Sequence, residues 1–327
     1  MVLTTSLNIG MRPDERVESI IKNVFSPYLT NFFDFTSDSH EIRGIECLWI
    51  DMTYPLDEFL LEKLPKLRYV VSPTTGLTHL GPLVRNRSDI DVISLRGDTD
   101  FLQEISATPE LAWGLALAVW RRIIPASKSY TSDLSIRQEF SSKQLRGLTV
   151  GLIGFGRIGK MLNNYARAFG MSTVFFDPYL PKSDSAIQDG AMRIESISNV
   201  CQQSDILFLV ASHNVNQESY YPILKKEHLL QLKSEAIVIN VSRGSLIDER
   251  ALFELIKGHK IAGAGIDVLA REEMVQVDLN LDPLQELERD GYNVIVTPHI
   301  GGMCWDAFDA AQRRVAEKLK AKVIARQ

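Results

Sequence analysis

A chain of 327 residues is too long for one ordinary hydrophobic core, so its length favours two domains. With 45% apolar and 24% charged residues and a net charge of −5 spread along the chain, its composition is globular and excludes a nucleic-acid-binding or membrane-surface protein. The three cysteines, odd in number and far apart, fit neither a disulfide framework nor a metal site, and they favour a reducing compartment.

The N-terminus carries no basic segment followed by an apolar core, so we expect no signal peptide. No apolar run approaches the roughly 20 residues that span a bilayer. These features predict a cytoplasmic protein that contacts neither membrane nor nucleic acid.

The first third of the chain alternates short apolar runs with amphipathic stretches. Strands are expected at 6–10, 46–51, 67–75 and 90–95, and helices at Asp14–Tyr28 and Leu56–Lys66. This alternation predicts βαβ units and a parallel sheet.

The next segment, 109–124, is a long helical stretch that is apolar on most sides and opens with a proline. Such a helix needs burial, either between domains or against a second subunit. We expect it to form the contact of a homodimer, the commonest symmetry, with packing inside one chain as the alternative. The polar, serine-rich segment 128–144 is expected to be a surface excursion.

From Leu148 the alternation of strands and helices resumes. Strands are expected at 148–155, 172–177, 205–211, 236–242, 262–269 and 293–298. Helices are expected at 157–169, 197–203, 226–232, 249–257 and 305–326.

Residues 154–159, GFGRIG, form a G-x-G-x-x-G motif between a predicted strand and a predicted helix, which is the context of a dinucleotide-binding loop. Gly154 permits the tight turn, Gly156 lets the backbone approach a pyrophosphate, and Gly159 lets helix and strand pack closely. The pyrophosphate is expected on the N–H groups at the start of the helix, near Arg157 and Ile158.

Asp177 ends the next predicted strand, at the position where an acid accepts hydrogen bonds from the adenosine ribose hydroxyls. A carboxylate there also repels a 2′-phosphate, which favours NAD over NADP. The alternative is that Asp177 only caps the turn into Pro178.

Polar groups follow three later strands. Arg243 follows 236–240, Asp267 ends GAGID with Glu272 soon after, and His299 ends NVIVTP. Ligands bind at the carboxyl ends of parallel strands, so these groups can converge on one crevice. Each alone would also fit a turn or cap, and His299 could be satisfied by a backbone carbonyl.

Four ordered motifs between about Tyr69 and Met303 resemble the D-isomer-specific 2-hydroxyacid dehydrogenases, a family that includes phosphoglycerate dehydrogenases. They are GFGRIG, NVSRGSLIDERAL (240–252), GAGIDVL (263–269) with an acid a few residues on, and TPHIGG (297–302). Four motifs in order make the resemblance specific.

The resemblance implies a role for each matching residue. His299 is expected to be the general acid/base, and Glu272 to orient its ring and stabilise the protonated form. Arg243 is expected to bind a 2-oxo acid, and Asp267 the nicotinamide carboxamide. Further cofactor contacts are implied at Val241, Ser242 and Gly302. A hydride would pass between nicotinamide and C2 of a small D-2-hydroxy acid.

The family also binds the substrate carboxylate through backbone N–H groups of a first-domain loop, here 73–80, with Thr75 and Gly76 at the donor positions. Thr78 stands where the family commonly has Asp, which leaves the substrate open. Near the adenine pocket, Val210 and Ser212 replace the usual His and Pro. Two further histidines are expected to have surface or loop roles, His79 and His213.

The implied architecture is α/β, with two Rossmann-like, doubly wound parallel-sheet domains. A flavodoxin-like substrate domain, 1–108, is interrupted by an NAD-binding domain, 109–301, and completed by a C-terminal helix, 302–327. The glycine motif agrees, because it appears only after a full set of βα units. We expect no further domain after the last helix.

The leading hypothesis is therefore an NAD-dependent oxidoreductase of small 2-oxo and 2-hydroxy acids. The alternative is an NAD(H)-sensing protein of the same fold, like the family's transcriptional corepressors, since the same site residues suit both. A formate dehydrogenase relative is less favoured, because formate oxidation needs no acid/base pair such as Glu272 with His299. Which acid is used stays open, as does any contact of Arg96 with a second acidic group.

Overall fold

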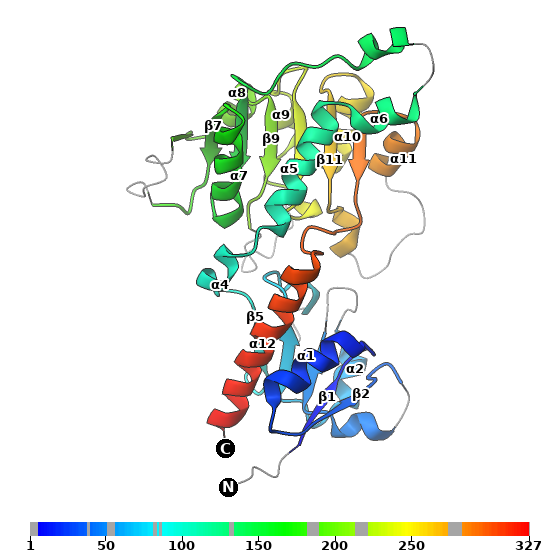
Figure 1. Cartoon of the computed structure of the whole chain (residues 1–327), viewed down its shortest axis with the longest axis vertical. Helices are drawn as coiled ribbons and strands as arrows, with labels where there is room; N and C mark the ends of the chain where they lie inside the picture. The colour runs from blue at the N-terminus through cyan, green and yellow to red at the C-terminus, as the bar shows by residue number, and fades with distance from the viewer. Residues whose placement is uncertain are drawn as a thin grey trace. The chain divides into compact units, whose positions relative to one another are not determined.

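The computed structural model describes residues 6–37, 40–50, 56–80, 84, 87–130, 134–181, 190–212, 222–273 and 283–326. The chain forms two compact units, the first of Met1–Ile105 with Met303–Gln327 and the second of Ser106–Gly302. Each unit is built on its own parallel sheet (Figure 1). The predicted α/β fold class with two doubly wound sheets is confirmed.

The sheet of the first unit has the order β2-β1-β3-β4-β5, that of flavodoxin-like folds. Its strands are β1 Leu7–Gly10, β2 Thr30–Phe33, β3 Cys47–Trp49, β4 Tyr69–Ser72 and β5 Asp91–Ser94. β3 and β4 are buried along their whole length, which explains their continuous apolar runs. β2 was not predicted from the sequence, because this edge strand has no fully buried residue and so no clear apolar pattern.

The helices of the first unit include α1, which begins where Asp14 accepts hydrogen bonds from the N–H groups of Arg16 and Val17. The helical segments are α1 Glu15–Phe25, η1 His40–Gly44, α2 Glu58–Lys63, η2 Thr78–Leu80 and α4 Thr99–Gln103.

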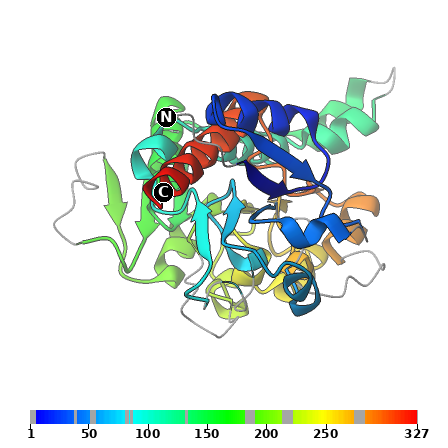
Figure 2. The same ribbon diagram turned by 90° about the horizontal axis from the view of Figure 1, so that it is seen from below.

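The C-terminal helix α12, Trp305–Ala325, returns to the first unit and lies beside α1 (Figures 1 and 2). Its apolar face buries Val315, Ala316 and Leu319 in the same core as strands β1, β3 and β4. A buried hydrogen bond of 2.9 Å runs from Nε1 of Trp49 to Oε1 of Gln312. The first unit is therefore discontinuous in sequence.

The second unit contains seven parallel strands in the order β8-β7-β6-β9-β10-β11-β12. They are β6 Thr149–Ile153, β7 Ser172–Phe176, β8 Ala191–Arg193, β9 Ile206–Leu209, β10 Ile237–Asn240, β11 Gly263–Ile266 and β12 Val294–Val296. The order reverses between β6 and β9, and at such a switch point the carboxyl ends of the strands open a crevice for ligands.

Helices cover both faces of this sheet. Alternate residues of each strand point to opposite faces, so each strand contributes apolar side chains to two cores. Phe208 and Ile239 face the core that contains α5 and α7, and Leu207 and Val238 face the core that contains α8 and α10. The helical segments are α5 Ala107–Trp120, α6 Ile123–Lys128, η3 Leu134–Phe140, α7 Arg157–Ala168, α8 Ile197–Gln203, α9 Lys226–Leu229, η5 Gly244–Leu246, α10 Glu249–Lys257, η6 Ala270–Glu273 and α11 Pro283–Arg289.

Helix α5 is shorter than the predicted segment 109–124, because the chain turns at Arg122, which has a positive φ of 52°, before α6 begins. Its apolar side chains pack within the second unit: Trp113 stacks on Phe208, and Nε1 of Trp120 donates to the Lys143 carbonyl. This packing inside one chain was the alternative to a subunit contact. In the part of the chain that the structure describes, no helix could cross a membrane.

Candidate functional site

The glycine loop joins the carboxyl end of β6 to α7. Gly154 has a positive φ of 99°, and a Cβ there would lie 2.7 Å from the backbone of Ala211, so only glycine fits. At Gly159, a Cβ would lie 2.7 Å from the carbonyl oxygen of Gly154. At Gly156, the N-cap of α7, a Cβ would meet nothing within 4 Å, and no side chain caps the helix. The start of α7 therefore has open space beside Gly156 and no side-chain cap, which is compatible with an anion at the helix N-terminus.

Arg157 begins α7 and is partly buried, and burial lowers the pKa of its guanidinium. Ile158 follows and packs against the second unit's core. Both residues therefore lie in the first turn of α7.

Asp177 lies just past the end of β7, beside the glycine loop. Its carboxylate accepts hydrogen bonds from the N–H of Phe155 and the N–H of Tyr179, both at 2.9 Å. The guanidinium of Arg193 donates to the carbonyl oxygens of Asp177 and Leu180, which fixes the turn. The negative charge is therefore held at the rim of the loop, as a partner for ribose hydroxyls requires.

Arg243 is presented by a turn that follows β10 and that the strand pattern does not predict. Asn240, fully buried at the end of β10, accepts from the N–H of Ser242 and donates to the carbonyl of Arg243. The Ser242 hydroxyl donates to the Ala211 carbonyl, and Val241 is buried. Arg243 Nη1 donates to the Ser242 carbonyl at 2.7 Å. The sequence feature that could have indicated this turn is Asn240, a polar residue at the end of an apolar strand.

Asp267 organises the turn that carries the histidine. It is 1% exposed, and it accepts hydrogen bonds from the Thr297 hydroxyl and from the N–H groups of Ile300 and Gly301, at 2.6 to 2.8 Å. Burial raises the pKa of this carboxyl, and the three hydrogen bonds oppose that rise. A Cβ on Gly301 would lie 3.0 Å from the carboxylate, whereas Gly302 faces open space.

His299 itself has a left-handed backbone, with φ of 54°. Its N–H donates to the carbonyl oxygens of Asp267 and Thr297, and its side chain is 27% exposed. Nδ1 of the ring lies 2.7 Å from Oε2 of Glu272. Oε1 of the same carboxylate accepts from the N–H of Leu269 at 2.7 Å. The structure therefore brings His299, Glu272 and Asp267 together, and leaves Nε2 as the ring nitrogen not engaged by Glu272.

Thr75 and Gly76 belong to the first unit, in the loop that follows β4. The loop is tied by Ser72, a fully buried residue whose hydroxyl lies 3.0 Å from the Thr74 hydroxyl and 2.9 Å from Nε2 of His79. The Thr74 hydroxyl donates to the Gly76 carbonyl at 2.7 Å. His79 thus has the loop role that was expected of it.

Some predicted positions lie outside the described residues. These are His213 and the side chain of Thr78. Of the adenine-pocket departures, Val210 is partly buried and its N–H donates to the Ile153 carbonyl, while Ser212 is exposed.

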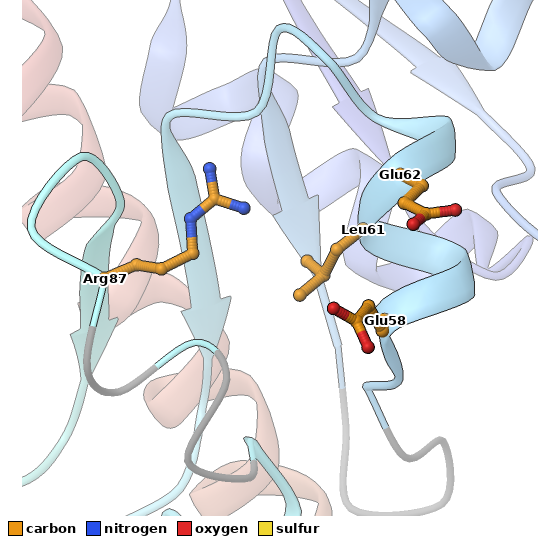
Figure 3. Close-up of a pocket in the computed structure, with 4 residues that line it drawn as sticks. All are labelled: Glu58, Leu61, Glu62 and Arg87. Carbon is orange, nitrogen blue, oxygen red and sulfur yellow. The ribbon is translucent and has the colours of Figure 1, made fainter.

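A cavity of about 300 Å³ in the first unit lies away from these residues. Figure 3 shows Arg87 extending toward α2, which carries Glu58, Leu61 and Glu62. Arg87 precedes β5 and pairs with Asp89 through two hydrogen bonds, whereas the 73–80 loop follows the carboxyl end of β4. In a parallel sheet these positions lie at opposite ends of the strands. The cavity is therefore no part of the candidate site, which lies at the carboxyl ends.

Comparison with known proteins supports the family resemblance that the sequence motifs indicate. Residues 113–301 match the family model described as D-isomer specific 2-hydroxyacid dehydrogenase, NAD binding domain. A D-3-phosphoglycerate dehydrogenase of Methanocaldococcus jannaschii is 33% identical over 280 residues, covering 86% of this chain and 50% of that protein. A glyoxylate reductase of Thermococcus litoralis is 32% identical over 289 residues, covering 86% of this chain and 81% of that protein.

The chain spans about half the length of the phosphoglycerate dehydrogenases that it matches. Among solved structures, a D-lactate dehydrogenase from Aquifex aeolicus, complexed with NAD and lactic acid, aligns with a TM-score of 0.79. The sequences are 22% identical, and the alignment covers 98% of this chain and 96% of that one. This likeness concerns the fold.

The glycine loop and the strand-end groups define an α/β protein with a dinucleotide-binding unit. The chain belongs to the D-isomer specific 2-hydroxyacid dehydrogenase family. Its second unit carries that family's NAD-binding domain, so the predictions of family and cofactor are confirmed.

Proposed function

We propose that this protein is an NAD-dependent dehydrogenase that interconverts small 2-oxo acids and D-2-hydroxy acids. The observation that carries the proposal is the distance of 2.7 Å between Nδ1 of His299 and Oε2 of Glu272. The names of the relatives support it: besides glyoxylate reductase, a hydroxypyruvate reductase of Thermotoga maritima is 30% identical over 265 residues.

In this proposal His299 moves the proton. Glu272 holds Nδ1, which fixes the ring and stabilises its positive charge, so Nε2 is the nitrogen that gives a proton to the carbonyl oxygen of the oxo acid. In the reverse direction Nε2 takes the hydroxyl proton. When bound, NADH would supply the hydride to C2 for reduction, and NAD⁺ would accept it for oxidation.

Arg243 is the proposed substrate anchor. A guanidinium can donate to both the carboxylate and the carbonyl oxygen of a 2-oxo acid, and the charge-assisted bonds polarise the carbonyl. The backbone N–H groups of Thr75 and Gly76, in the first unit, are the proposed donors to the substrate carboxylate. The first unit is thus the proposed substrate domain.

The cofactor contacts are proposed from the geometry of the glycine loop together with the family resemblance. The N–H groups at the start of α7, with Gly154, Gly156 and Gly159, would hold the pyrophosphate. Asp177 would hold the ribose, and Asp267 the carboxamide. Further contacts are proposed at Arg157, Ile158, Val241, Ser242 and Gly302.

The proposal extends to assembly: the protein forms a homodimer in the cytoplasm. Ile123, 50% exposed, and Tyr130, 83% exposed, lie just after α5 and offer apolar surface to a second copy. Light scattering of the purified protein at two concentrations would give the mass of a dimer, or of a single chain if this part of the proposal is wrong.

The test of the activity is NADH consumption across a panel of 2-oxo acids. The panel comprises glyoxylate, hydroxypyruvate, pyruvate, 2-oxoglutarate and 3-phosphohydroxypyruvate, with His299→Asn as the inactive variant. The proposal predicts turnover of at least one acid, lowered on the order of 10³-fold or more by the substitution. Tight NADH binding without turnover of any acid would instead favour the NAD(H)-sensing alternative.

A further inference from the structure

The segment that carries Glu272 begins with two backbone N–H groups, and carboxylates occupy both. Oε1 of Glu272 accepts from the N–H of Leu269, and Oε1 of Glu249 accepts from the N–H of Ala270 at 2.8 Å. Glu249 comes from a different element, since it is the first residue of α10. The start of η6 is thus bound by the side chain of Glu249, which belongs to a different helix.

The place of Glu249 is itself fixed. Asp248 caps α10 and accepts from the N–H of Ala251 at 2.9 Å, which sets the first turn of the helix. Gly244 lies directly against the same segment: a Cβ there would lie 2.0 Å from the Ala270 nitrogen and 2.1 Å from the Leu269 carbonyl carbon. The backbone of η5 (Gly244–Leu246), five residues before Glu249, therefore touches the start of η6, with no room for a side chain between them.

Rigid placement matters because Glu272 and His299 come from separate strand ends. Their ring-to-carboxylate distance is 2.7 Å, and the two side chains are 27% and 32% exposed, so burial does little to hold them. A displacement of about 1 Å in such a pair can cost on the order of 100-fold in rate.

We propose that Glu249 is a positioning residue: by binding the N–H of Ala270, it keeps Glu272 against His299. The proposal rests on the proposed dehydrogenase function for its effect on turnover. Its structural part, the dependence of the Glu272–His299 contact on Glu249, does not need any substrate.

The experiment compares Glu249→Ala, Glu249→Gln and Glu254→Ala. Glu254 is the matched control, because it lies on the same helix and pairs with Lys226 at the surface. We expect Glu249→Ala to lower kcat about tenfold with unchanged NADH affinity, whereas Glu249→Gln keeps most activity because its amide oxygen accepts the same N–H. Glu254→Ala should behave as wild type.

A double-mutant cycle separates positioning from general damage to the fold. If Glu249 acts through Glu272, Glu249→Ala should have no further effect on kcat in a Glu272→Ala background. The proposal would be overturned if the double variant lost kcat by the product of the two single losses. It would also be overturned if Glu249→Ala were as active as Glu254→Ala.

A readout without turnover distinguishes this proposal from the dehydrogenase function. The ¹⁵N chemical shifts of the His299 ring, assigned with His299→Asn, report on the hydrogen bond at Nδ1. At fixed pH, Glu249→Ala should move them toward the values seen in Glu272→Ala. Unmoved shifts would overturn the proposal, whether or not any oxo acid is reduced.

Discussion

His299 illustrates how much a single residue depends on its neighbours. A left-handed backbone costs a non-glycine residue on the order of 1–2 kcal/mol, so it persists only where the surroundings impose it. Here Asp267 imposes it through the Thr297 hydroxyl and two following N–H groups. The motif TPHIGG identified the histidine, but nothing in a sequence reveals a positive φ at a residue other than glycine.

The carboxylate of Asp177 accepts the N–H of Phe155, and it is also the group that we propose holds the ribose. Replacing it with alanine should weaken NADH binding by about 1–3 kcal/mol, or roughly 5- to 150-fold, because charge-assisted hydrogen bonds are lost. NADPH binding should weaken less or improve, since the charge that repels the 2′-phosphate is gone.

Fluorescence titration of wild type and Asp177→Ala with both nucleotides measures this preference. An equal loss of affinity for NADH and NADPH would mean that Asp177 only caps its turn, as the alternative reading of the sequence held.

At the scale of elements, periodicity predicted most strands and helices of both sheets, and α8 and α10 to the residue. It failed where burial leaves no pattern, as at the edge strand β2, and where a backbone turn at Arg122 interrupts an apolar run. It also could not reveal the network inside the 73–80 loop, because Ser72 and His79 have no pattern that links them.

That network gives a prediction for the loop after β4. Removing the Ser72 hydroxyl in Ser72→Ala leaves Thr74 and His79 without their shared partner, at a cost of about 1 kcal/mol for each lost hydrogen bond. The loop with Thr75 and Gly76 should loosen, so KM for the oxo acid should rise roughly 5- to 20-fold while NADH affinity stays unchanged.

Steady-state kinetics with a titration of NADH measures both quantities. Ser204→Ala is the matched control, because Ser204 is also fully buried and its hydroxyl donates to a helix carbonyl in the second unit. If Ser72→Ala and the control gave the same KM, the network would have no part in substrate binding.

At the scale of the whole molecule, the chain closes its first unit with its last helix. Asp98 and Arg314 are 216 residues apart, and the guanidinium donates to both carboxylate oxygens at 2.7 and 3.0 Å. The sequence predicted an amphipathic helix at 305–326, but only the family resemblance indicated which domain it joins. No local pattern could pair two charges across so long a separation.

This pair makes stability depend on pH in a defined direction. The hydrogen bond from Arg314 holds the pKa of Asp98 below its ordinary value. The stabilisation is therefore fully present above the ordinary carboxyl pKa of about 4, and is lost as pH falls through the lowered value. Asp98→Asn should lower the Tm by about 2 °C at pH 7, and the difference from wild type should shrink below about pH 4.

Calorimetric scans of both proteins from pH 7 to pH 3 measure the effect. A difference in Tm that stays constant across this range would show that the charge of Asp98 does not contribute.

The central claim is that His299 and Glu272 act as one proton-transferring pair. The measurement that tests it most directly is kcat for oxo-acid reduction at neutral pH in wild type and in Glu272→Gln. The glutamine can still hydrogen-bond to Nδ1 but carries no negative charge to stabilise the positive ring. We predict that kcat falls on the order of 10- to 100-fold. A Glu272→Gln enzyme with the wild-type rate would contradict the account.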